Sequence, residues 1–243
     1  MTLLVVDGIG KSFGGLRALD GISFHIEQGE IVGLMGANGA GKTTLFSIIA
    51  GHTRPEHGNV LFNGESILGL RPDKVCRMGI ARTFQIVRPF NGMTVRENVE
   101  TAIIFGAPRQ QSVISCENQA MNILEEVGLD DVADKLAGTL TLSGRKRLEV
   151  ARALGTGPEL LLLDEVMAGL TPTEVEQMII TIRQVKQNRN LALIVVEHVV
   201  RALVTLSHRI VVLHHGQKIA EGVPEEIAKH PDVLQAYFGE ASA

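Results

Sequence analysis

The sequence predicts an α/β fold in which helices flank the core of a parallel β-sheet. Four aliphatic runs carry this prediction: IVGLM at 31–35, LLLL at 160–163, LALIVV at 191–196 and IVVL at 210–213. Unbroken apolar runs of this length are typical of strands that are buried on both faces of a parallel sheet. The longer segments between them repeat apolar residues at helical spacing, which is typical of helices that cover such a sheet.

The N-terminal part of the chain has a different pattern. Phe24 and Ile26 alternate with polar residues, and the apolar residues 60–62 lead into Asn63-Gly64. This dipeptide suits a type I′ turn, the turn that most often joins two antiparallel strands. We therefore expect a small antiparallel sheet, an N-terminal β subdomain, beside the parallel core.

The first parallel strand runs into a glycine-rich loop. It comprises Gly36, Ala37, Asn38, Gly39, Ala40, Gly41, Lys42 and Thr43, and Thr44 follows in a helical pattern. Glycines let successive backbone N–H groups point inward at phosphate oxygens, and the N-terminus of the following helix adds a partial positive charge. In such a loop Lys42 reaches the β- and γ-phosphates and Thr43 offers its hydroxyl to Mg²⁺. The sequence therefore predicts a site for a nucleotide and Mg²⁺.

Two carboxylates end the second aliphatic run. Asp164 and Glu165 follow LLLL directly, so they are expected at the carboxyl edge of a buried strand. A carboxylate there can hold Mg²⁺, directly or through water, and the next one can orient or activate an attacking water. We assign the metal role to Asp164 and the catalytic role to Glu165.

Helical patterns dominate the middle of the chain. The segment 66–140 contains few strand signals and several helix-like stretches, such as MNILEEVGL at 121–129. Further along, Thr171 and Glu174 form a capping box with Pro172 at the first helical position, so a helix should begin at Thr171. The sequence thus predicts a mostly helical insertion within the α/β core.

Composition excludes several classes of protein. The 243 residues carry a formal net charge of −4 with a pI of about 6.1, and this balance argues against a nucleic-acid binder with an overall basic field. Cys76 and Cys116 have no metal-ligand spacing, and we expect both to be reduced thiols in a cytoplasmic protein. Residues 1–10 do not read as a secretory signal, and no apolar run approaches the roughly 20 residues that span a bilayer. Any membrane role is expected to come through partners.

A cluster of cations stands at 141–154, TLSGRKRLEVARAL. Arg145, Glu149 and Arg152 are spaced to share one helical face, where Glu149 can pair with either arginine. The apolar residues between them fit a helix packed on the core. We expect the start of this helix to favour a phosphate rather than nucleic acid, because free N–H groups and the helix dipole attract an anion there.

Together, these motifs resemble those of an ATP-binding cassette (ABC) ATPase, a P-loop NTPase. They are the loop at 36–43, Gln85, LSGRK at 142–146, LLLLDE at 160–165 and His198, in that order. More narrowly, the chain is similar to the ATP-binding subunits of branched-chain amino acid importers. That likeness lies in FGGLRALDGISF at 13–24, ARTFQ at 81–85, MTVRENV at 93–99, DEVMAGLTPTE at 164–174, and PEEI and AYFGE near the end.

The resemblance implies further site residues. Phe13 matches the aromatic residue that stacks on adenine, Gln85 the glutamine that touches Mg²⁺ and the membrane partner, and His198 the switch histidine at the γ-phosphate. Ser143 and Gly144 match the signature segment that closes over ATP held by a second cassette, identical or paralogous. Taken alone, a histidine after a strand is more often structural.

The resemblance also implies a domain plan and partners. The chain is expected to form a single ABC ATPase domain over 1–243, with a helical subdomain at about 86–155 and a C-terminal tail at 222–243. It would sit on the cytoplasmic face of the cell membrane through two permease subunits, with a solute-binding protein as an indirect partner. Urea, amide or lipid import is an alternative, and so is a non-transport ABC ATPase acting on nucleic acid.

The sequence departs from the general cassette pattern in three places. Arg145 and Lys146 stand where a second signature glycine and a glutamine are usual. Residues 166–167 are Val-Met where Pro-Thr is usual, and Thr171 replaces an aspartate in the next loop. The departures concern the contact between two cassettes more than the binding of ATP.

Overall fold

The computed structural model describes residues 1–85, 88–106 and 113–238. The chain divides into two compact units, the first made of residues 1–72 with 192–243 and the second of residues 73–191. Within the described residues, no helix is both long and apolar enough to cross a membrane.

The first unit begins with the antiparallel sheet that the sequence predicts. Its strands are β1 (Thr2–Phe13), β2 (Leu16–Glu27), β4 (His57–Phe62) and β5 (Glu65–Ser66), in the order β2-β1-β4-β5. Asn63 and Gly64 join β4 to β5 with φ angles of 50° and 82°. Positive φ at both central residues is the mark of a type I′ turn, so the predicted hairpin is confirmed.

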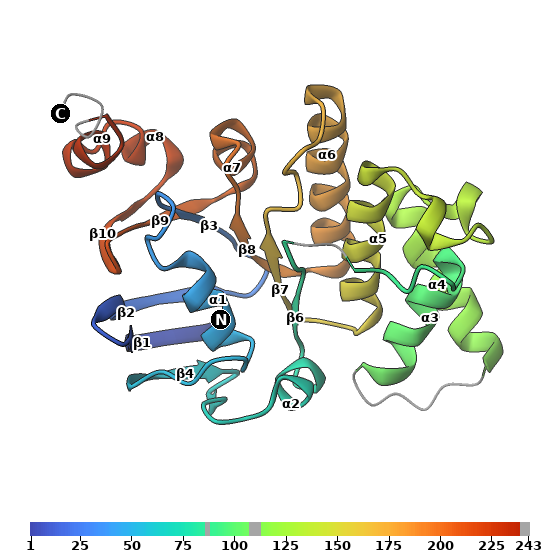
Figure 1. Ribbon diagram of the computed structural model, residues 1–243, viewed down its shortest axis with the longest axis horizontal. Coiled ribbons are helices and arrows are strands. Elements are labelled where there is room, and N and C mark those ends of the chain that lie inside the picture. Colours follow the sequence, from blue (N-terminus) through green and yellow to red (C-terminus); the bar gives the residue numbers. More distant parts are fainter. Residues whose placement is uncertain (86–87, 107–112, 239–243) are drawn as a thin grey trace. The chain divides into compact units, whose positions relative to one another are not determined.

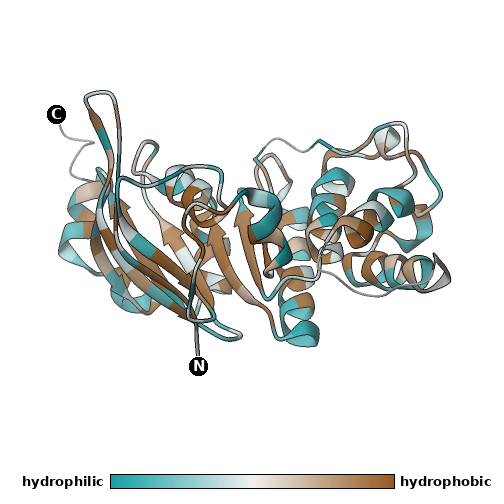
Figure 2. Ribbon diagram, turned by 90° about the horizontal axis from the view of Figure 1, so that it is seen from below, coloured by the Kyte–Doolittle hydropathy of each residue, from teal (hydrophilic) through white to brown (hydrophobic). Residues whose placement is uncertain are grey.

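The same unit also holds four strands of a second sheet. They are β3 (Ile31–Met35), β8 (Ala192–Val196), β9 (Arg209–His214) and β10 (Gln217–Gly222), and the first three match predicted aliphatic runs. β3 pairs in parallel with β8 and β9, and β10 adds an antiparallel edge to β9. The strands drawn largely in brown in Figure 2 include β3, β8 and β9, whose buried residues are apolar, as expected for strands covered on both faces.

Four helices complete the first unit. They are α1 (Lys42–Ile49), α7 (Val200–Leu206), α8 (Pro224–Ile227) and α9 (Pro231–Phe238). Leu45, Ile48 and Ile49 form the buried stripe of α1, and Gly51, with φ 76°, follows its C-cap Ala50. Residues 239–243 of the predicted C-terminal tail lie outside the described residues.

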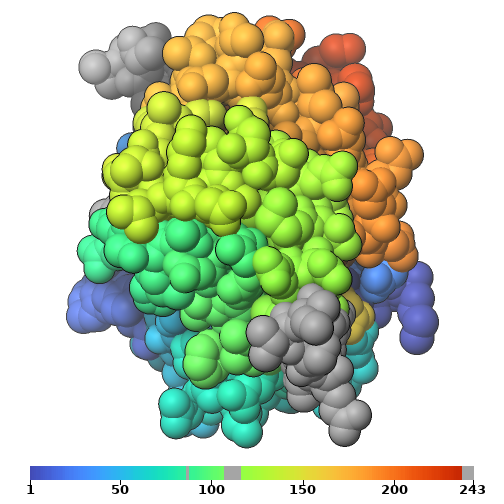
Figure 3. Space-filling view, turned by 90° about the vertical axis from the view of Figure 1, so that its right-hand side faces the viewer, coloured from blue at the N-terminus to red at the C-terminus, as the bar shows by residue number. Residues whose placement is uncertain are grey.

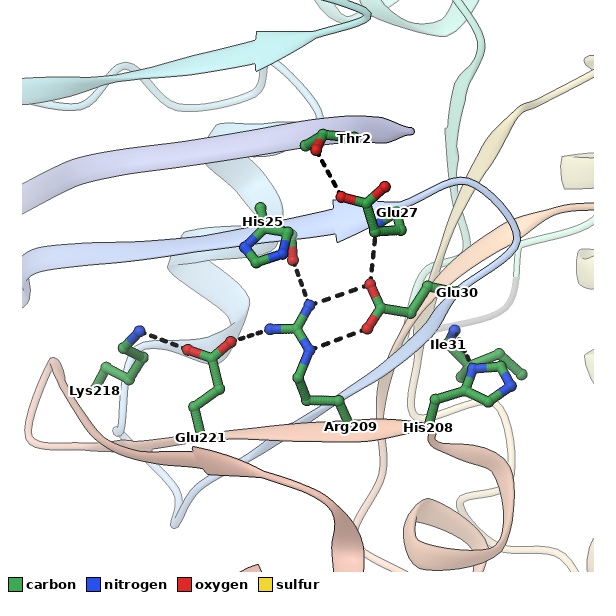
Figure 4. A network of polar contacts seen from close by, with 9 residues as sticks. All are labelled: Thr2, His25, Glu27, Glu30, Ile31, His208, Arg209, Lys218 and Glu221. Carbon is green, nitrogen blue, oxygen red and sulfur yellow. Dashed lines mark hydrogen bonds and ion pairs between the residues drawn. The ribbon is translucent and has the colours of Figure 1, made fainter.

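A polar network joins the two sheets of the first unit at one end (Figure 4). The Arg209 guanidinium of β9 donates to both carboxylate oxygens of Glu30, at 3.0 and 3.1 Å, and to the His25 carbonyl at 2.7 Å. It also pairs with Glu221, which accepts a 2.6 Å hydrogen bond from Lys218. Since Glu30 directly precedes β3, this network holds the start of the strand that carries the glycine-rich loop.

The second unit combines two parallel strands with helices. Its elements are α2 (Pro72–Arg77), β6 (Ile80–Arg82), α3 (Val95–Phe105), α4 (Val113–Val127), α5 (Leu142–Gly155), β7 (Leu160–Asp164) and α6 (Pro172–Arg189). Two short 3-10 turns, Asp130–Val132 and Ala137–Thr139, join α4 to α5. Thr171 is the N-cap of α6 in a full capping box with Glu174, which confirms the predicted helix start.

Three helices of this unit form a group. α3, α4 and α5 pack against one another (Figure 1), and the green to yellow-green surface of Figure 3 belongs to this unit. Among the described residues of 66–140, helices outnumber strands as predicted, and the strand residues there are Ser66, at the end of β5, and those of β6. The β6 strand has only three residues, too few for a recognisable alternation, and its place is set by parallel pairing with β7. The bounds 86–155 for a helical subdomain stay a prediction.

Candidate functional site

The glycine-rich loop joins β3 to α1 in the first unit, as the sequence predicts. Gly39 and Gly41 have φ angles of 82° and 105°, which side chains other than glycine rarely adopt. A Cβ on Gly36 would meet the Leu213 carbonyl oxygen at 2.6 Å. The α1 helix then begins at Lys42, and no side chain caps it. The loop therefore presents backbone N–H groups and a helix N-terminus, the donors that bind phosphate.

Lys42 lies folded against this loop. Its side chain is buried, and Nζ donates to the carbonyls of Gly36 at 2.6 Å and Ala37 at 3.0 Å. The next residue, Thr43, is exposed. An ammonium group and a hydroxyl thus lie at the end of this loop. A phosphate chain that carries Mg²⁺ needs both, the ammonium for phosphate oxygens and the hydroxyl for the metal ion.

Phe13 and His198 also lie in the first unit. Phe13 ends β1, is 53% exposed, and has the Lys11 ammonium 5.3 Å from the centre of its ring. An exposed aromatic face of this kind can stack on a flat ring system. His198 is exposed just after β8. Their roles toward a nucleotide stay predictions.

Asp164 ends β7 in the second unit, at the strand edge that the sequence predicts. Its carboxylate accepts a 2.7 Å hydrogen bond from Arg82 Nη2, and the two side chains are only 4% and 9% exposed. The Asp164 N–H donates to the hydroxyl of Thr83, which is fully buried. Sequence analysis missed Arg82 because no local spacing links β6 to β7.

Glu165 follows in a strained conformation. Its φ angle is 52°, in the left-handed region that costs a residue other than glycine about 1–3 kcal/mol. Its carboxylate accepts a 2.7 Å hydrogen bond from Gln85 Nε2, on the exposed segment that follows β6. Two residues that the sequence assigns to the chemistry therefore touch each other, although 80 positions separate them.

The start of α5 differs in detail from the expectation. Thr141 is the N-cap, and its side-chain oxygen accepts a 3.2 Å hydrogen bond from the Gly144 N–H, so that group is not free. Ser143 lies in the first turn. A cavity of about 350 Å³ opens beside these residues, lined also by Arg147 and Glu174. A threonine just before a helical pattern is an N-cap signal, and this signal could have added Thr141 to the candidate residues.

The predicted pairing of Glu149 with an arginine is wrong. Arg145 donates instead to the carbonyls of Gly138 and Leu140. Arg152 donates to the Arg88 carbonyl at 3.0 Å, and Glu149 accepts a short hydrogen bond from the Phe84 N–H. Burial raises the pKa of the Glu149 carboxyl, although this hydrogen bond opposes the shift. Arg145, Glu149 and Arg152 therefore bond backbone groups of neighbouring loops instead of one another's side chains.

The predicted site residues thus fall into two sets. Phe13, the loop 36–44 and His198 belong to the first unit. The second unit holds Gln85 and Glu165 in contact, Asp164 paired with Arg82, and the α5 start with Ser143 and Gly144. Within the described residues, no group of three or more His, Cys, Asp or Glu side chains is arranged to hold a metal ion.

Comparison with protein families gives two matches. Residues 19–168 match the family model described as ABC transporter. Residues 217–243 match the one described as Branched-chain amino acid ATP-binding cassette transporter.

Curated relatives match almost the whole chain. The high-affinity branched-chain amino acid transport ATP-binding protein BraF of Pseudomonas aeruginosa is 38% identical, with 98% of each chain covered. The corresponding protein LivG of Escherichia coli is 37% identical, again with 98% of each chain covered. The probable LivG of Archaeoglobus fulgidus is 34% identical over 98% of this chain and 96% of its own.

Solved structures have the same fold. A crystal structure of the ADP conformation of an ATP-binding cassette of an ABC transporter has a TM-score of 0.88 at 29% identity, covering 98% of this chain and 99% of its own. A nucleotide-free cassette has a TM-score of 0.86 at 28% identity, with 98% and 100% covered.

Proposed function

This chain belongs to the ABC transporter family, and we propose that it is the ATP-hydrolysing motor subunit of an importer for branched-chain amino acids. The observation that carries the catalytic part is the 2.7 Å contact between the Gln85 amide and the Glu165 carboxylate. The cargo is inferred from the relatives BraF and LivG and from the family match over residues 217–243. The same observations favour amino acids over urea, amides, lipids or a nucleic-acid function.

The loop 36–43 binds the phosphate chain of ATP in this proposal. Its N–H groups and the N-terminus of α1 hold phosphate oxygens, and Lys42 turns from the Gly36 and Ala37 carbonyls toward the β- and γ-phosphates. Thr44 continues the same helical turn. Phe13 supports the adenine ring from one face.

The donor set fits Mg²⁺. This ion binds oxygen ligands and is usually held by one or two carboxylates together with substrate phosphates. Thr43 offers a hydroxyl, Asp164 a carboxylate, and Gln85 its amide oxygen, because its amide nitrogen is already committed to Glu165. Bound Mg²⁺ would neutralise charge on the β- and γ-phosphates.

Hydrolysis then depends on positioning and charge. Glu165 orients the attacking water and accepts its proton, and Gln85 holds that carboxylate by its hydrogen bond. His198 donates to the γ-phosphate, where negative charge accumulates. Ser143 and Gly144, at the start of α5, close over ATP bound to a second cassette.

Two cassettes working with two permease subunits complete the proposed assembly. ATP binding draws the cassettes together, hydrolysis releases them, and the permeases transmit this motion to the cargo path. The subunit would work on the cytoplasmic face of the cell membrane, and a solute-binding protein would deliver the cargo on the other side.

Glu165→Gln in the reconstituted transporter tests this proposal. We expect ATP affinity within about twofold of wild type and a turnover at least about a hundredfold lower, because the general base is lost. Uptake of labelled leucine, measured beside labelled urea, tests the cargo. Turnover near the wild-type value would remove Glu165 from the catalytic role, and uptake of urea alone would overturn the assignment of the cargo.

A further inference from the structure

Lys146 is a buried cation that connects two residues of the candidate site. It lies on α5 with only 3% of its surface exposed. Its Nζ donates to the Glu165 carbonyl oxygen at 2.9 Å and to the Gln85 carbonyl oxygen at 3.4 Å. One ammonium group therefore bonds the backbones of the two residues whose side chains also touch.

Such burial needs a compensating interaction. Removing an ammonium ion from water has an effective penalty of several kcal/mol, which good hydrogen-bond geometry has to offset. The two carbonyls supply acceptors, and the charge of nearby Glu149 adds a favourable interaction with Lys146. A lysine suits this place because it has three donors and no acceptor on a long stem.

The contact with Glu165 falls where the backbone is strained. A residue with φ 52° stays there only when its surroundings hold it in place. The bond from Lys146 to the Glu165 carbonyl holds the peptide that follows the strained residue, while Gln85 holds its carboxylate. Lys146 thus restrains the main chain of Glu165, and Gln85 restrains its side chain.

Other side chains of α5 contact described residues on either side of 86–87. Glu149 accepts a hydrogen bond from the Phe84 N–H, one residue before Gln85. Arg152 donates to the Arg88 carbonyl, and its guanidinium carbon lies 4.9 Å from the centre of the Phe90 ring. Positions 146, 149 and 152 recur every three residues, which places all three side chains along one side of the helix.

We propose that Lys146 is a positioning residue, which sets the catalytic geometry of Glu165 and couples it to the segment that carries Gln85. The inference rests on the proposed function, since it needs Glu165 to be the base. If the segment that carries Gln85 moves, the hydrogen bonds of Lys146 move the Glu165 peptide with it. The orientation of the Glu165 carboxylate toward the attacking water therefore depends on the position of that segment.

Lys146→Met tests the proposal in the reconstituted transporter. Methionine is one atom shorter than lysine, keeps an unbranched apolar stem and has no donor, so both carbonyls lose their bond. We expect kcat for ATP hydrolysis to fall at least tenfold while KM for ATP changes less than twofold. A purely structural role would lower the amount of folded protein without separating kcat from KM.

Lys146→Gln is a second variant for the case that methionine does not fold. Its amide is one bond shorter than the lysine stem and cannot serve both carbonyls, so kcat is expected to fall at least threefold. Arg189→Met is the matched control. It removes a partly buried cation at the C-terminal end of α6 that makes two 2.8 Å hydrogen bonds to Glu126 in the same unit, and it should leave kcat within twofold.

Combination with Glu165→Gln separates the two ideas. Because Lys146 acts through Glu165, adding Lys146→Met to Glu165→Gln should cause less than a twofold further loss. Additive losses, a wild-type kcat in either folded Lys146 variant, or an equal loss in the control would each overturn the positioning role alone. Wild-type turnover in Glu165→Gln would instead overturn the proposed catalytic assignment, and the positioning role with it.

Discussion

The ion pair between Arg82 and Asp164 offers a direct test of the interior of the second unit. The two side chains are 9% and 4% exposed, and a 2.7 Å hydrogen bond joins them. Arg82→Met removes the cation and leaves a carboxylate buried at the end of β7. Asp164 keeps the bond from its N–H to Thr83, but its negative charge loses its compensation.

The size of the effect follows from this burial. Breaking a buried ion pair by removal of one partner costs about 3–5 kcal/mol. Each kcal/mol shifts the melting temperature of a domain of roughly this size by about 2–4 °C, so Arg82→Met should lower Tm by about 6–20 °C. We would measure Tm of the full chain by circular dichroism at pH 7 without nucleotide.

A second variant isolates the charge. In Arg82→Met with Asp164→Asn neither ion is present, so at least half of the lost Tm should return. Asp164→Asn alone leaves the Arg82 guanidinium buried without its carboxylate and should also be destabilising. A loss of less than about 2 °C for Arg82→Met, or a double variant as unstable as the sum of the single ones, would refute the reasoning.

Two further predictions concern single side chains. Asn98 is fully buried and bonds the N–H and carbonyl of Phe90 and the carbonyl of Thr94. Asn98→Ala leaves these groups without a partner and should lower the free energy of unfolding, measured by urea denaturation, by about 2–4 kcal/mol. A change below about 1 kcal/mol would contradict this prediction. Burial raises the pKa of Glu221, but the Lys218 hydrogen bond and nearby charges outweigh it and hold that pKa below its ordinary value. The resulting stability is present above the unfolded pKa of 4.5 and is lost as pH falls through the lower folded pKa. Glu221→Gln should thus destabilise by about 1 kcal/mol at pH 7, with a difference that shrinks below about pH 4.5; a difference that grows on acidification would show the opposite sign.

Local chemistry explains what was predictable from the sequence. The strands β3, β7, β8 and β9 consist mainly of continuous aliphatic runs. Such runs are typical of strands that are buried on both faces of a parallel sheet. The turn at Asn63-Gly64 and the cap at Thr171 depend on residues within a few positions of each other. The loop 36–43 is recognisable for the same reason.

The sequence by itself thus determined the class of fold, the phosphate loop and the carboxylates that end β7. Only the tertiary structure decided that Arg82 pairs with Asp164, that Gln85 touches Glu165, and that Lys146 is buried between their backbones. The α5 helix shows why. Spacing places Arg145, Glu149 and Arg152 on one face, but backbone groups compete for the same side chains: Arg145 bonds carbonyls of the turn just before α5, and Glu149 and Arg152 bond groups that follow β6. The partners of Glu149 and Arg152 come within reach only once parallel pairing has set β6 beside β7, a contact between residues about 80 positions apart that no local pattern encodes.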